Sequence, residues 1–253
     1  MKTNTFEYPD YFARFYDVIY HKVRAGVDTG FFLKKIKDCN GKVLEIGAGT
    51  GRFFIDALNQ GVDIYGIDIS PSMTGILKSK LDKSQHFRII TGDAGTMKLD
   101  RKFDLIVAPF RVFSHVQDTH EQIRFLNNVY DHLNDNGRFI FDLFVPDPNL
   151  LAHGMKNVVD FEGEYEPGKK LKRICSSVPD IVNQLLDVTM RFEWEEKNTL
   201  QTKEWNFKMR FFFRFELEYL VKFSKLNLET IYGDYSEGSL DKNSKDFVVV
   251  CSR

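Results

Sequence analysis

An apolar run followed by three glycines at every second position most restricts what this chain can fold into. The run VLEI at residues 43–46 is followed by GAGTGR at residues 47–52. Glycine carries no Cβ, so it permits a sharp turn and a close approach of the backbone to a ligand. Free N–H groups at the start of a helix also point at a bound molecule. The stretch therefore predicts a buried strand, a tight turn and a helix beginning near Gly51, arranged to hold a nucleotide-like molecule.

The spacing of these glycines excludes two common nucleotide sites. A dinucleotide site follows the pattern G-x-G-x-x-G, but Arg52 stands where its third glycine belongs. The phosphate-binding pattern G-x-x-x-x-G-K-[ST] fails as well, because neither Lys nor Ser/Thr follows as required. What remains is E-x-G-x-G-x-G after a strand, and the rest of the chain has to show which nucleotide it holds.

The charge balance of the chain argues against a nucleic-acid or membrane partner. The 253 residues contain 35 Lys and Arg and 36 Asp and Glu, a formal net charge of -1. Such a chain has no general positive field to attract nucleic acid or an anionic membrane. No segment approaches the roughly 20 apolar residues of a membrane span, and the N-terminus lacks an apolar signal core. We therefore expect a cytoplasmic enzyme that acts on a small-molecule substrate, with neither nucleic acid nor a membrane as partner.

The cysteines indicate neither a disulfide framework nor a metal site. Cys39, Cys175 and Cys251 are far apart, odd in number and in no C-x-x-C arrangement. We expect buried reduced thiols and no bound metal.

Strand-like and helix-like segments alternate from residue 43 to residue 143. Near-continuously apolar strands joined by helices predict a parallel sheet that helices bury on both faces. Ser70-Pro71 predicts a helix start, and Asn134–Gly137 has the composition of a turn. The expected strands are Val43–Ile46, Ile64–Ile67, Phe87–Ile90, Leu105–Ala108 and Phe139–Phe144, and the expected helices are Thr29–Lys37, Phe53–Gln60, Pro71–Leu81 and Thr119–Leu133.

After Asp142 the period of the sequence changes to that of an antiparallel insertion. Apolar and polar residues alternate cleanly in the last two of its four strands, which oppose their apolar faces across a turn at Lys197-Asn198. A helix and a final pair of strands follow. The expected segments are strands Val158–Tyr165, Lys169–Val178, Leu185–Glu195 and Lys203–Phe213, helix Phe215–Leu226, and strands Leu228–Tyr232 and Phe247–Cys251.

The first 20 residues are rich in tyrosine and phenylalanine. Phe12, Phe15, Tyr16, Ile19 and Tyr20 have helical spacing and predict one stripe of an amphipathic helix. This helix either only covers the sheet or also contributes to a substrate pocket.

Two acids follow the glycine turn, each at the end of an expected strand. In open α/β sheets the ligand lies at the carboxyl ends of the strands, so Asp68 is placed to accept both hydroxyls of a ribose and Asp93 the amino hydrogens of an adenine. The alternative for Asp68 is an ordinary acid at a helix start. In this order, the glycine turn and the two acids resemble the motifs of the class I S-adenosylmethionine (SAM) dependent methyltransferases. The resemblance covers about residues 41–143 and the final pair of strands.

This resemblance implies SAM as the cofactor and an α/β fold: a Rossmann-like seven-stranded sheet with a reversed C-terminal strand, plus an antiparallel β insertion forming a lid. We expect residues 1–40 to form an N-terminal helical cap, residues 41–145 and 214–253 the SAM-binding core, and residues 146–213 the insertion, as substrate lid or dimer contact. The implied cofactor contacts are Tyr11, Tyr20, Glu45, Gly47, Ala48, Gly49, Gly51, Asp68, Ile69, Asp93, Ala94 and Pro109.

Residues 103–110 resemble the fourth motif of the family, whose strand end faces the sulfonium methyl. Several amino- and amide-methylating branches have N/D-P-P-Y/F there, whereas this chain has Ala-Pro-Phe-Arg at 108–111, which disfavours methylation of a nucleobase amino group or of glutamine. The stretch 111–116 is more similar to small-molecule enzymes, in particular the aminosugar and glycine N-methyltransferase branches. In enzymes that act on nucleotide-linked aminosugars, a histidine at the place of His115 lines the substrate pocket.

The resemblance also suggests which residues act on the acceptor. His115 is a candidate general base, since the reference pKa of histidine lies near 6.5, or else a structural residue. Arg111 either binds a carboxylate or phosphate of the acceptor or forms an ordinary salt bridge. Tyr16, in the Tyr-Asp-x-x-Tyr element at 16–20, is the second catalytic candidate, because an aromatic face suits the sulfonium. Phe110 and Asp142 complete the expected substrate contacts.

Methyl transfer from a sulfonium needs little from the protein beyond alignment and exclusion of water, which can supply up to roughly 7 to 11 kcal/mol. We therefore expect transfer from SAM to a nitrogen or oxygen of a small molecule, with a homodimer as one possible assembly. The alternatives are a non-catalytic SAM-binding protein, an RNA or protein methyltransferase, and a nicotinamide oxidoreductase.

Overall fold

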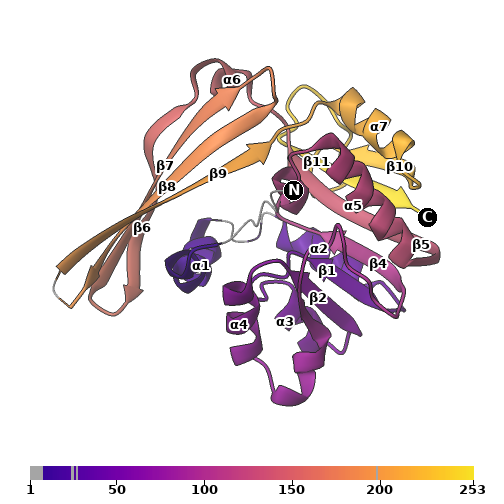
Figure 1. Cartoon of the computed structure of the whole chain (residues 1–253), viewed down its shortest axis with the longest axis horizontal. Helices are drawn as coiled ribbons and strands as arrows, with labels where there is room; N and C mark the ends of the chain where they lie inside the picture. Colours follow the sequence, from indigo (N-terminus) through magenta and orange to yellow (C-terminus); the bar gives the residue numbers. More distant parts are fainter. Residues whose placement is uncertain (1–7, 24–25, 27, 198) are drawn as a thin grey trace.

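The chain forms two β-sheets with helix α1 (Asp10–Val23) beside them (Figure 1). The structure, a computed structural model, describes residues 8–23, 26, 28–197 and 199–253. Sheet A has seven strands and sheet B has four. Helices cover sheet A and form a core with it. Sheet B projects beyond this core, and α1 lies beneath sheet B (Figure 1).

Sheet A is a mostly parallel sheet with one reversed strand. Its order is β10-β11-β5-β4-β1-β2-β3. The neighbours from β5 to β3 are parallel, whereas β11 runs antiparallel to both β5 and β10, which confirms the predicted reversed C-terminal strand. The strands are β1 (Val43–Ile46), β2 (Ile64–Asp68), β3 (Ile89–Thr91), β4 (Phe103–Ala108), β5 (Leu133–Phe144), β10 (Asn227–Tyr232) and β11 (Asp246–Ser252).

Both faces of sheet A are buried by helices, as its continuously apolar strands require. Successive side chains of a strand point to opposite faces, so Leu44 packs with α5 and α7, whereas Val43 packs with α2 and α3. Helix α4 begins at Pro71 because the Ser70 side chain accepts from the Met73 N–H. The helices are α2 (Thr29–Lys37), α3 (Phe54–Asn59), α4 (Pro71–Ser79), α5 (Thr119–His132) and α7 (Arg214–Phe223).

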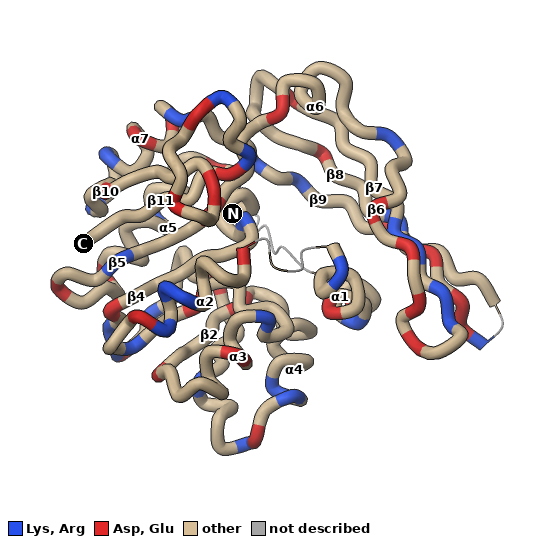
Figure 2. Tube along the Cα trace, turned by 180° about the vertical axis from the view of Figure 1, so that it is seen from behind, with Lys and Arg blue, Asp and Glu red and all other residues tan. Residues whose placement is uncertain are grey.

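Sheet B is an antiparallel sheet whose apolar face holds α1. Met190 of β8 pairs with Trp205 of β9, as the alternating pattern predicts. Phe12, Phe15 and Tyr20 of α1 are buried in one cluster with the aromatic residues of this face. The distal end of the sheet carries charges of both signs (Figure 2). The strands are β6 (Met155–Glu166), β7 (Lys169–Asp180), β8 (Leu185–Glu196) and β9 (Thr199–Arg210), and α6 (Pro148–His153) precedes them.

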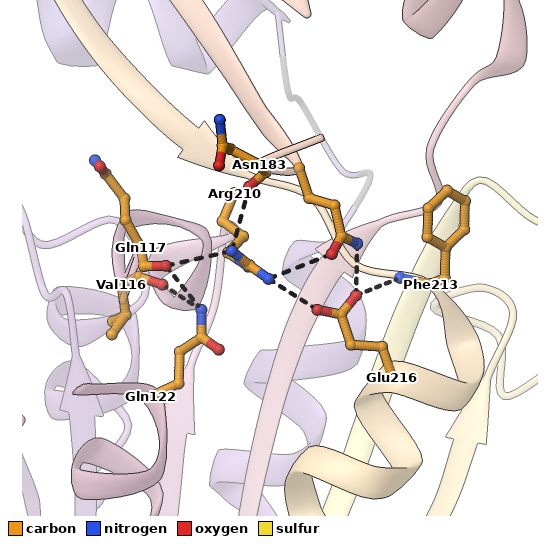
Figure 3. A network of polar contacts seen from close by, with 8 residues as sticks. Val116, Gln117, Gln122, Asn183, Arg210, Phe213 and Glu216 are labelled. Carbon is orange, nitrogen blue, oxygen red and sulfur yellow. Dashed lines mark hydrogen bonds and ion pairs between the residues drawn. The ribbon is translucent and has the colours of Figure 1, made fainter. Parts of the chain in front are cut away.

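A polar network centred on Arg210 joins sheet B to the core (Figure 3). The Arg210 guanidinium lies 3.0 Å from the Glu216 carboxylate at the start of α7 and 3.5 Å from the Gln117 carbonyl oxygen. Gln122 donates to the Val116 carbonyl oxygen at 2.8 Å. The base of sheet B is therefore bonded to the segment 112–117 that follows β4.

Three of the element boundaries that differ from the predicted ones have a cause in the structure. The strand expected at Phe87–Ile90 begins only at Ile89, because the Asp82 carboxylate caps a 3-10 helix over Lys83–Arg88. The turn expected at Asn134–Gly137 is an irregularity within β5, where the pairing register shifts and the φ of Asn136 is 65°. Neither feature has a periodic signal in the sequence.

The third difference concerns the end of the insertion. The strand expected over Lys203–Phe213 starts at Thr199 and ends at Arg210, since the Phe211 N–H bonds to the Gln184 carbonyl oxygen and Phe213 becomes the N-cap of α7. The aromatic alternation simply continues past the end of the strand. Asn198 of the expected turn lies outside the described residues.

Candidate active site

Two adjoining cavities lie at the carboxyl ends of β1, β2 and β4, the edge at which parallel sheets bind ligands. Their volumes are about 440 Å³ and about 150 Å³, and Gly47, Asp68 and His115 line both. Other residues expected from the sequence that line the larger cavity are Tyr16, Tyr20, Glu45, Ala48, Gly49, Pro109, Phe110 and Arg111. Those that line only the smaller one are Ile69, Asp93 and Ala94.

The glycine turn has the backbone that only glycine adopts readily. The φ values of Gly47, Gly49 and Gly51 are 75°, 55° and 97°. A Cβ at Gly47 would lie 2.3 Å from a methyl group of Val112, and one at Gly51 would lie 2.4 Å from a methyl group of Leu77. The turn is therefore fixed by left-handed backbone and by close packing at the same time. Gly51 supports the turn without lining either cavity.

The Asp68 carboxylate bonds to the turns that follow β1 and β2. These turns border the carboxyl edge of sheet A beside the glycine turn, which we call the cofactor edge. Its Oδ2 accepts the Gly49 N–H at 2.8 Å and its Oδ1 accepts the Ser70 N–H at 2.9 Å. Burial raises the pKa of Asp68, and these two hydrogen bonds act in the opposite direction. Each oxygen keeps a further lone pair, so the carboxylate can still accept hydrogen bonds from a ligand.

Glu45 is a buried carboxylate with an unmet hydrogen-bonding need. Its side chain lines the larger cavity, its exposed fraction is 1%, and its Oε2 has no hydrogen-bond partner among the described residues. Burial raises the pKa of Glu45 well above its ordinary value, while the nearby Arg52 guanidinium lowers it. A buried acceptor of this kind fits a positively charged donor on a ligand, such as the ammonium group of SAM.

Each arginine of the larger cavity has a carboxylate close to it. Arg52 contacts Asp28 through two bonds of 2.7 and 2.8 Å. Arg173 of β7 forms a similar pair with Asp160 of β6, at 2.9 and 2.8 Å. Arg111 is held least, by Asp246 at 3.5 Å. Among the described residues, every arginine that lines the larger cavity therefore already has a counter-ion, so none is left over for an anionic ligand.

The loop after β4 is strained. Phe110 and Arg111 are consecutive non-glycine residues with left-handed backbone, at φ 64° and 62°. Such a conformation costs about 1–2 kcal/mol per residue. The Arg111 N–H bonds to Asp142 Oδ1 at 3.1 Å, and the Tyr235 hydroxyl donates to Asp142 Oδ2 at 2.6 Å. The loop ends in a short 3-10 helix, η2 (Val112–His115).

Asp142 lines neither cavity, whereas the sequence leads us to expect that it contacts the substrate. It is fully buried at an exposed fraction of 0% and lies beneath the loop after β4. Tyr11 also departs from expectation. Its ring packs on Trp194 and Phe192 of sheet B, and it lines neither cavity, because it faces the sheet and not the turn.

His115 lies where the two cavities meet. Its ring packs near Phe207 of β9, with centroids 5.9 Å apart. Burial lowers the pKa of His115 to about 4, so the imidazole is neutral at pH 7. A neutral imidazole can accept a hydrogen bond or a proton.

Helix α1 is fixed to the cofactor edge by polar contacts. The Thr50 hydroxyl donates to Asp17 Oδ1 at 2.6 Å, and Lys80 of α4 contacts Asp17 Oδ2 at 2.6 Å. These contacts place Tyr16 and Tyr20 against the larger cavity. Burial raises the pKa of both phenols, so they stay protonated at neutral pH. We predicted no role for Asp17, although it stands between the two tyrosines in the sequence.

Other cavity residues were not predicted as site residues. Trp205, Phe207 and Met209 line the larger cavity from β9, together with Asp160 and Arg173. The alternating pattern placed the β9 residues on one apolar face, but it could not distinguish a face that packs on the core from one that borders a cavity. A charged pair within sheet B has no comparable signal in the sequence.

The reversed β11, the glycine turn and the acid at the end of β2 define a class I methyltransferase fold. Residues 44–139 match the family model described as "Methyltransferase domain". This stretch of the chain therefore matches a methyltransferase domain, the family that its motifs predict.

Particular relatives extend this comparison. Over 106 residues the chain is 33% identical to a malonyl-acyl-carrier-protein O-methyltransferase of Ilyobacter polytropus, and this match covers less than half of either protein, 40% of this chain and 37% of the relative. The structure resembles a SAM-dependent methyltransferase of Clostridium acetobutylicum, with a TM-score of 0.77, 20% identity and coverage of 95% and 98% of the two chains. It also resembles the sugar N-methyltransferase KedS8 of Streptoalloteichus, with a TM-score of 0.73, 16% identity and coverage of 93% and 92%. At these identities the two structures show the fold.

Two further properties of the described residues bear on the site. No helix among them is long and apolar enough to cross a membrane. Within the same ranges, no group of three or more His, Cys, Asp or Glu side chains is placed to hold a metal ion.

Proposed function

We propose that the chain transfers the methyl group of SAM to the nitrogen of a small-molecule amine. The observation that carries this proposal is the composition of the larger cavity. It adjoins the glycine turn, it has aromatic walls, and each of its arginines has a carboxylate within 3.5 Å. The fold shared with the sugar N-methyltransferase KedS8 agrees with a small acceptor.

The residues around the glycine turn fit SAM. We assign Glu45 to the ammonium group, since its unmet acceptor is buried in the cavity wall. Asp68 is assigned to the ribose hydroxyls, and Asp93 with Ala94 in the smaller cavity to adenine. The bound cofactor supplies an activated methyl group on a sulfonium. The protein residues contribute binding, alignment and exclusion of water.

An amine acceptor fits the charge of the cavity. As the carbon–sulfur bond breaks and the carbon–nitrogen bond forms, the positive charge moves from sulfur to nitrogen, and the product ammonium then loses a proton. The faces of Tyr16, Tyr20 and Trp205 suit a cation throughout this transfer. A carboxylate acceptor would instead need a cation without a counter-ion. An amine nitrogen is therefore a better acceptor atom than a carboxylate oxygen for this cavity.

We assign His115 to the acceptor nitrogen. With a pKa lowered to about 4 by burial, the imidazole is neutral at pH 7, so it can accept a hydrogen bond from an N–H of the acceptor and orient the nitrogen, while the proton that the product ammonium loses passes to water. Tyr16 is assigned an orienting role, because its phenol stays protonated and offers a donor. Phe110 and Arg111 also line the larger cavity, and the weakly held Arg111 is the best place for a second polar group of the acceptor.

The test is binding followed by turnover. Calorimetry with S-adenosylhomocysteine should show binding, and a panel of primary and secondary amines should yield methylated product detected by mass spectrometry. Absence of binding would exclude the cofactor. Binding without methylation of any amine, carboxylic acid or hydroxyl compound would favour a non-catalytic SAM-binding protein. RNA binding that weakens steeply with salt would favour an RNA methyltransferase.

A further inference from the structure

We propose that Asp142, with Tyr235, is a positioning residue that holds the strained loop Phe110–Arg111 in the conformation that shapes the acceptor cavity. This inference rests on the proposed function for its catalytic consequence. Asp142 lines neither cavity, so it acts on the acceptor only through the loop.

The loop does not hold its own conformation. A left-handed backbone is common for glycine and tolerable for asparagine and aspartate, but phenylalanine and arginine have no local preference for it. Two such residues in succession persist only where their surroundings enforce the conformation. Phe110 and Arg111, with φ of 64° and 62°, are such a pair.

Asp142 is the group placed to enforce it. Its Oδ1 accepts the backbone N–H of Arg111 at 3.1 Å, and this bond forms only when the loop turns back over β5. Its Oδ2 accepts the Tyr235 hydroxyl at 2.6 Å, and that hydroxyl also lies 3.4 Å from Asp246. The Tyr235 ring packs near Phe31 of α2. The brace is therefore held in place by groups of β11 and α2.

What the loop shapes is the acceptor side of the cavity. The Phe110 ring packs against Tyr20 of α1, with centroids 5.0 Å apart. The next residues form η2, which presents His115 to both cavities. Glu45 and Asp68, by contrast, lie on β1 and β2 and are not bonded to this loop. A released loop should therefore impair turnover more than cofactor binding.

A matched pair of substitutions isolates the strain. Arg111→Ala and Arg111→Gly both remove the side chain, but only glycine adopts the left-handed backbone freely. Each is combined with Asp142→Ala. In the Arg111→Ala background, Asp142→Ala should lower turnover about 100-fold, whereas in the Arg111→Gly background it should lower it less than about 5-fold. The affinity for S-adenosylhomocysteine should stay within about 3-fold in all four proteins.

Thermal unfolding gives a second readout that needs no acceptor. Asp142→Ala should lower the unfolding temperature by several degrees more in the Arg111→Ala background than in the Arg111→Gly background. If the wild-type chain methylates no amine, the proposed function fails, but this difference still decides whether Asp142 braces the loop. Equal losses in both backgrounds would overturn the inference, because a carboxylate needed only for general stability would not distinguish them.

Two milder variants cover the case in which Asp142→Ala does not fold. In Asp142→Asn, the amide oxygen can still accept the Arg111 N–H, and the amide N–H can donate to Tyr235, whose hydroxyl then turns to Asp246. We expect this variant to keep turnover within about 3-fold of wild type. Tyr235→Phe removes one side of the brace and should lower turnover about 5- to 10-fold. A loss above 20-fold in Asp142→Asn, or none in Tyr235→Phe, would overturn the inference.

Discussion

The cofactor edge of sheet A and the acceptor wall formed by α1, sheet B and the loop after β4 are built in different ways. At the cofactor edge, backbone N–H groups and carboxylates follow one another within short stretches such as 45–51 and 68–70. At the acceptor wall, side chains converge from segments far apart in the chain: the Arg173 guanidinium donates to the Tyr20 hydroxyl across 153 positions. Local sequence therefore builds the proposed cofactor site, and long-range packing builds the proposed acceptor site.

Charge separates the two regions as well. The cofactor edge has a buried carboxylate with an unmet acceptor, Glu45, whereas the charges of the acceptor wall are paired with one another. A region with a charged group that lacks a hydrogen-bond partner is suited to bind a charged ligand. A region whose charged groups are already paired is suited to select a ligand by shape and by cation–aromatic contact. Four substitutions test this contrast.

The largest effect is expected for Asp68→Ala. This change removes the acceptor of two backbone N–H groups and of the proposed ribose contact, so S-adenosylhomocysteine should bind at least about 100-fold more weakly by calorimetry. The control is Asp93→Ala, which lines only the smaller cavity and should weaken binding about 10-fold. An Asp68→Ala protein that binds within 3-fold of wild type would show that the cofactor lies elsewhere.

His115→Ala should lower turnover more than cofactor affinity. Turnover should fall about 100-fold, while the affinity for S-adenosylhomocysteine changes little. Because burial lowers the pKa of His115 to about 4, the rate should be independent of this group above pH 5 and fall as the pH drops through 4. The control is His153→Ala, on the exposed surface of α6. A rate inflection near pH 6.5 that disappears in His115→Ala would contradict the proposed burial.

Glu45→Gln should weaken cofactor binding and raise the stability of the apo protein. Loss of the carboxylate should weaken S-adenosylhomocysteine binding about 10- to 50-fold, since a charged hydrogen bond is replaced by a neutral one. The apo protein should nevertheless unfold at a higher temperature. The raised pKa of folded Glu45 means that wild-type stability falls as the pH rises from the ordinary carboxyl range through that pKa. The stability gain of Glu45→Gln should therefore grow with pH, and a gain that shrinks with rising pH would contradict this account.

The smallest effect is expected for Asp17→Asn. Asp17 joins α1 to Thr50 and Lys80, but its ion pair with Lys80 is partly exposed and contributes little. Binding of S-adenosylhomocysteine should weaken about 2- to 3-fold at low salt, and the difference should vanish at high salt. Arg14→Gln, which removes the ion pairs of α1 with Glu196 and Glu166 of sheet B and leaves Asp17 intact, serves as control. A larger loss for Arg14→Gln would show that α1 is held mainly by sheet B.

The sequence predicted the cofactor edge well because each of its elements has a local signal. The glycines, the apolar strands and the Ser70-Pro71 helix start each determine the backbone conformation of residues close to them in the sequence. Sheet A with its reversed strand is the predicted fold. The contribution of single residues to SAM binding stays a prediction.

The acceptor wall lacked such signals. Tyr11, Tyr16 and Tyr20 share one helix, and periodicity cannot say which of them faces sheet B and which the cavity. Asp142 follows the sequence pattern of a site residue, yet it lies under a loop whose left-handed backbone at Phe110 and Arg111 has no signature in residue type. Loops of this kind are enforced by surroundings that the local sequence does not contain.

The packing of α1 on sheet B also has a consequence for how the molecule assembles. Domains begin to fold from the N-terminus during synthesis, and contacts between distant segments form slowly. Arg14 of α1 bonds to Glu196, which is 182 positions further along the chain. Helix α1 must therefore wait for the hairpin of β8 and β9 before its aromatic face is covered. A nascent chain that stops before residue 185 would leave that face open to chaperones, even where the glycine turn has already formed.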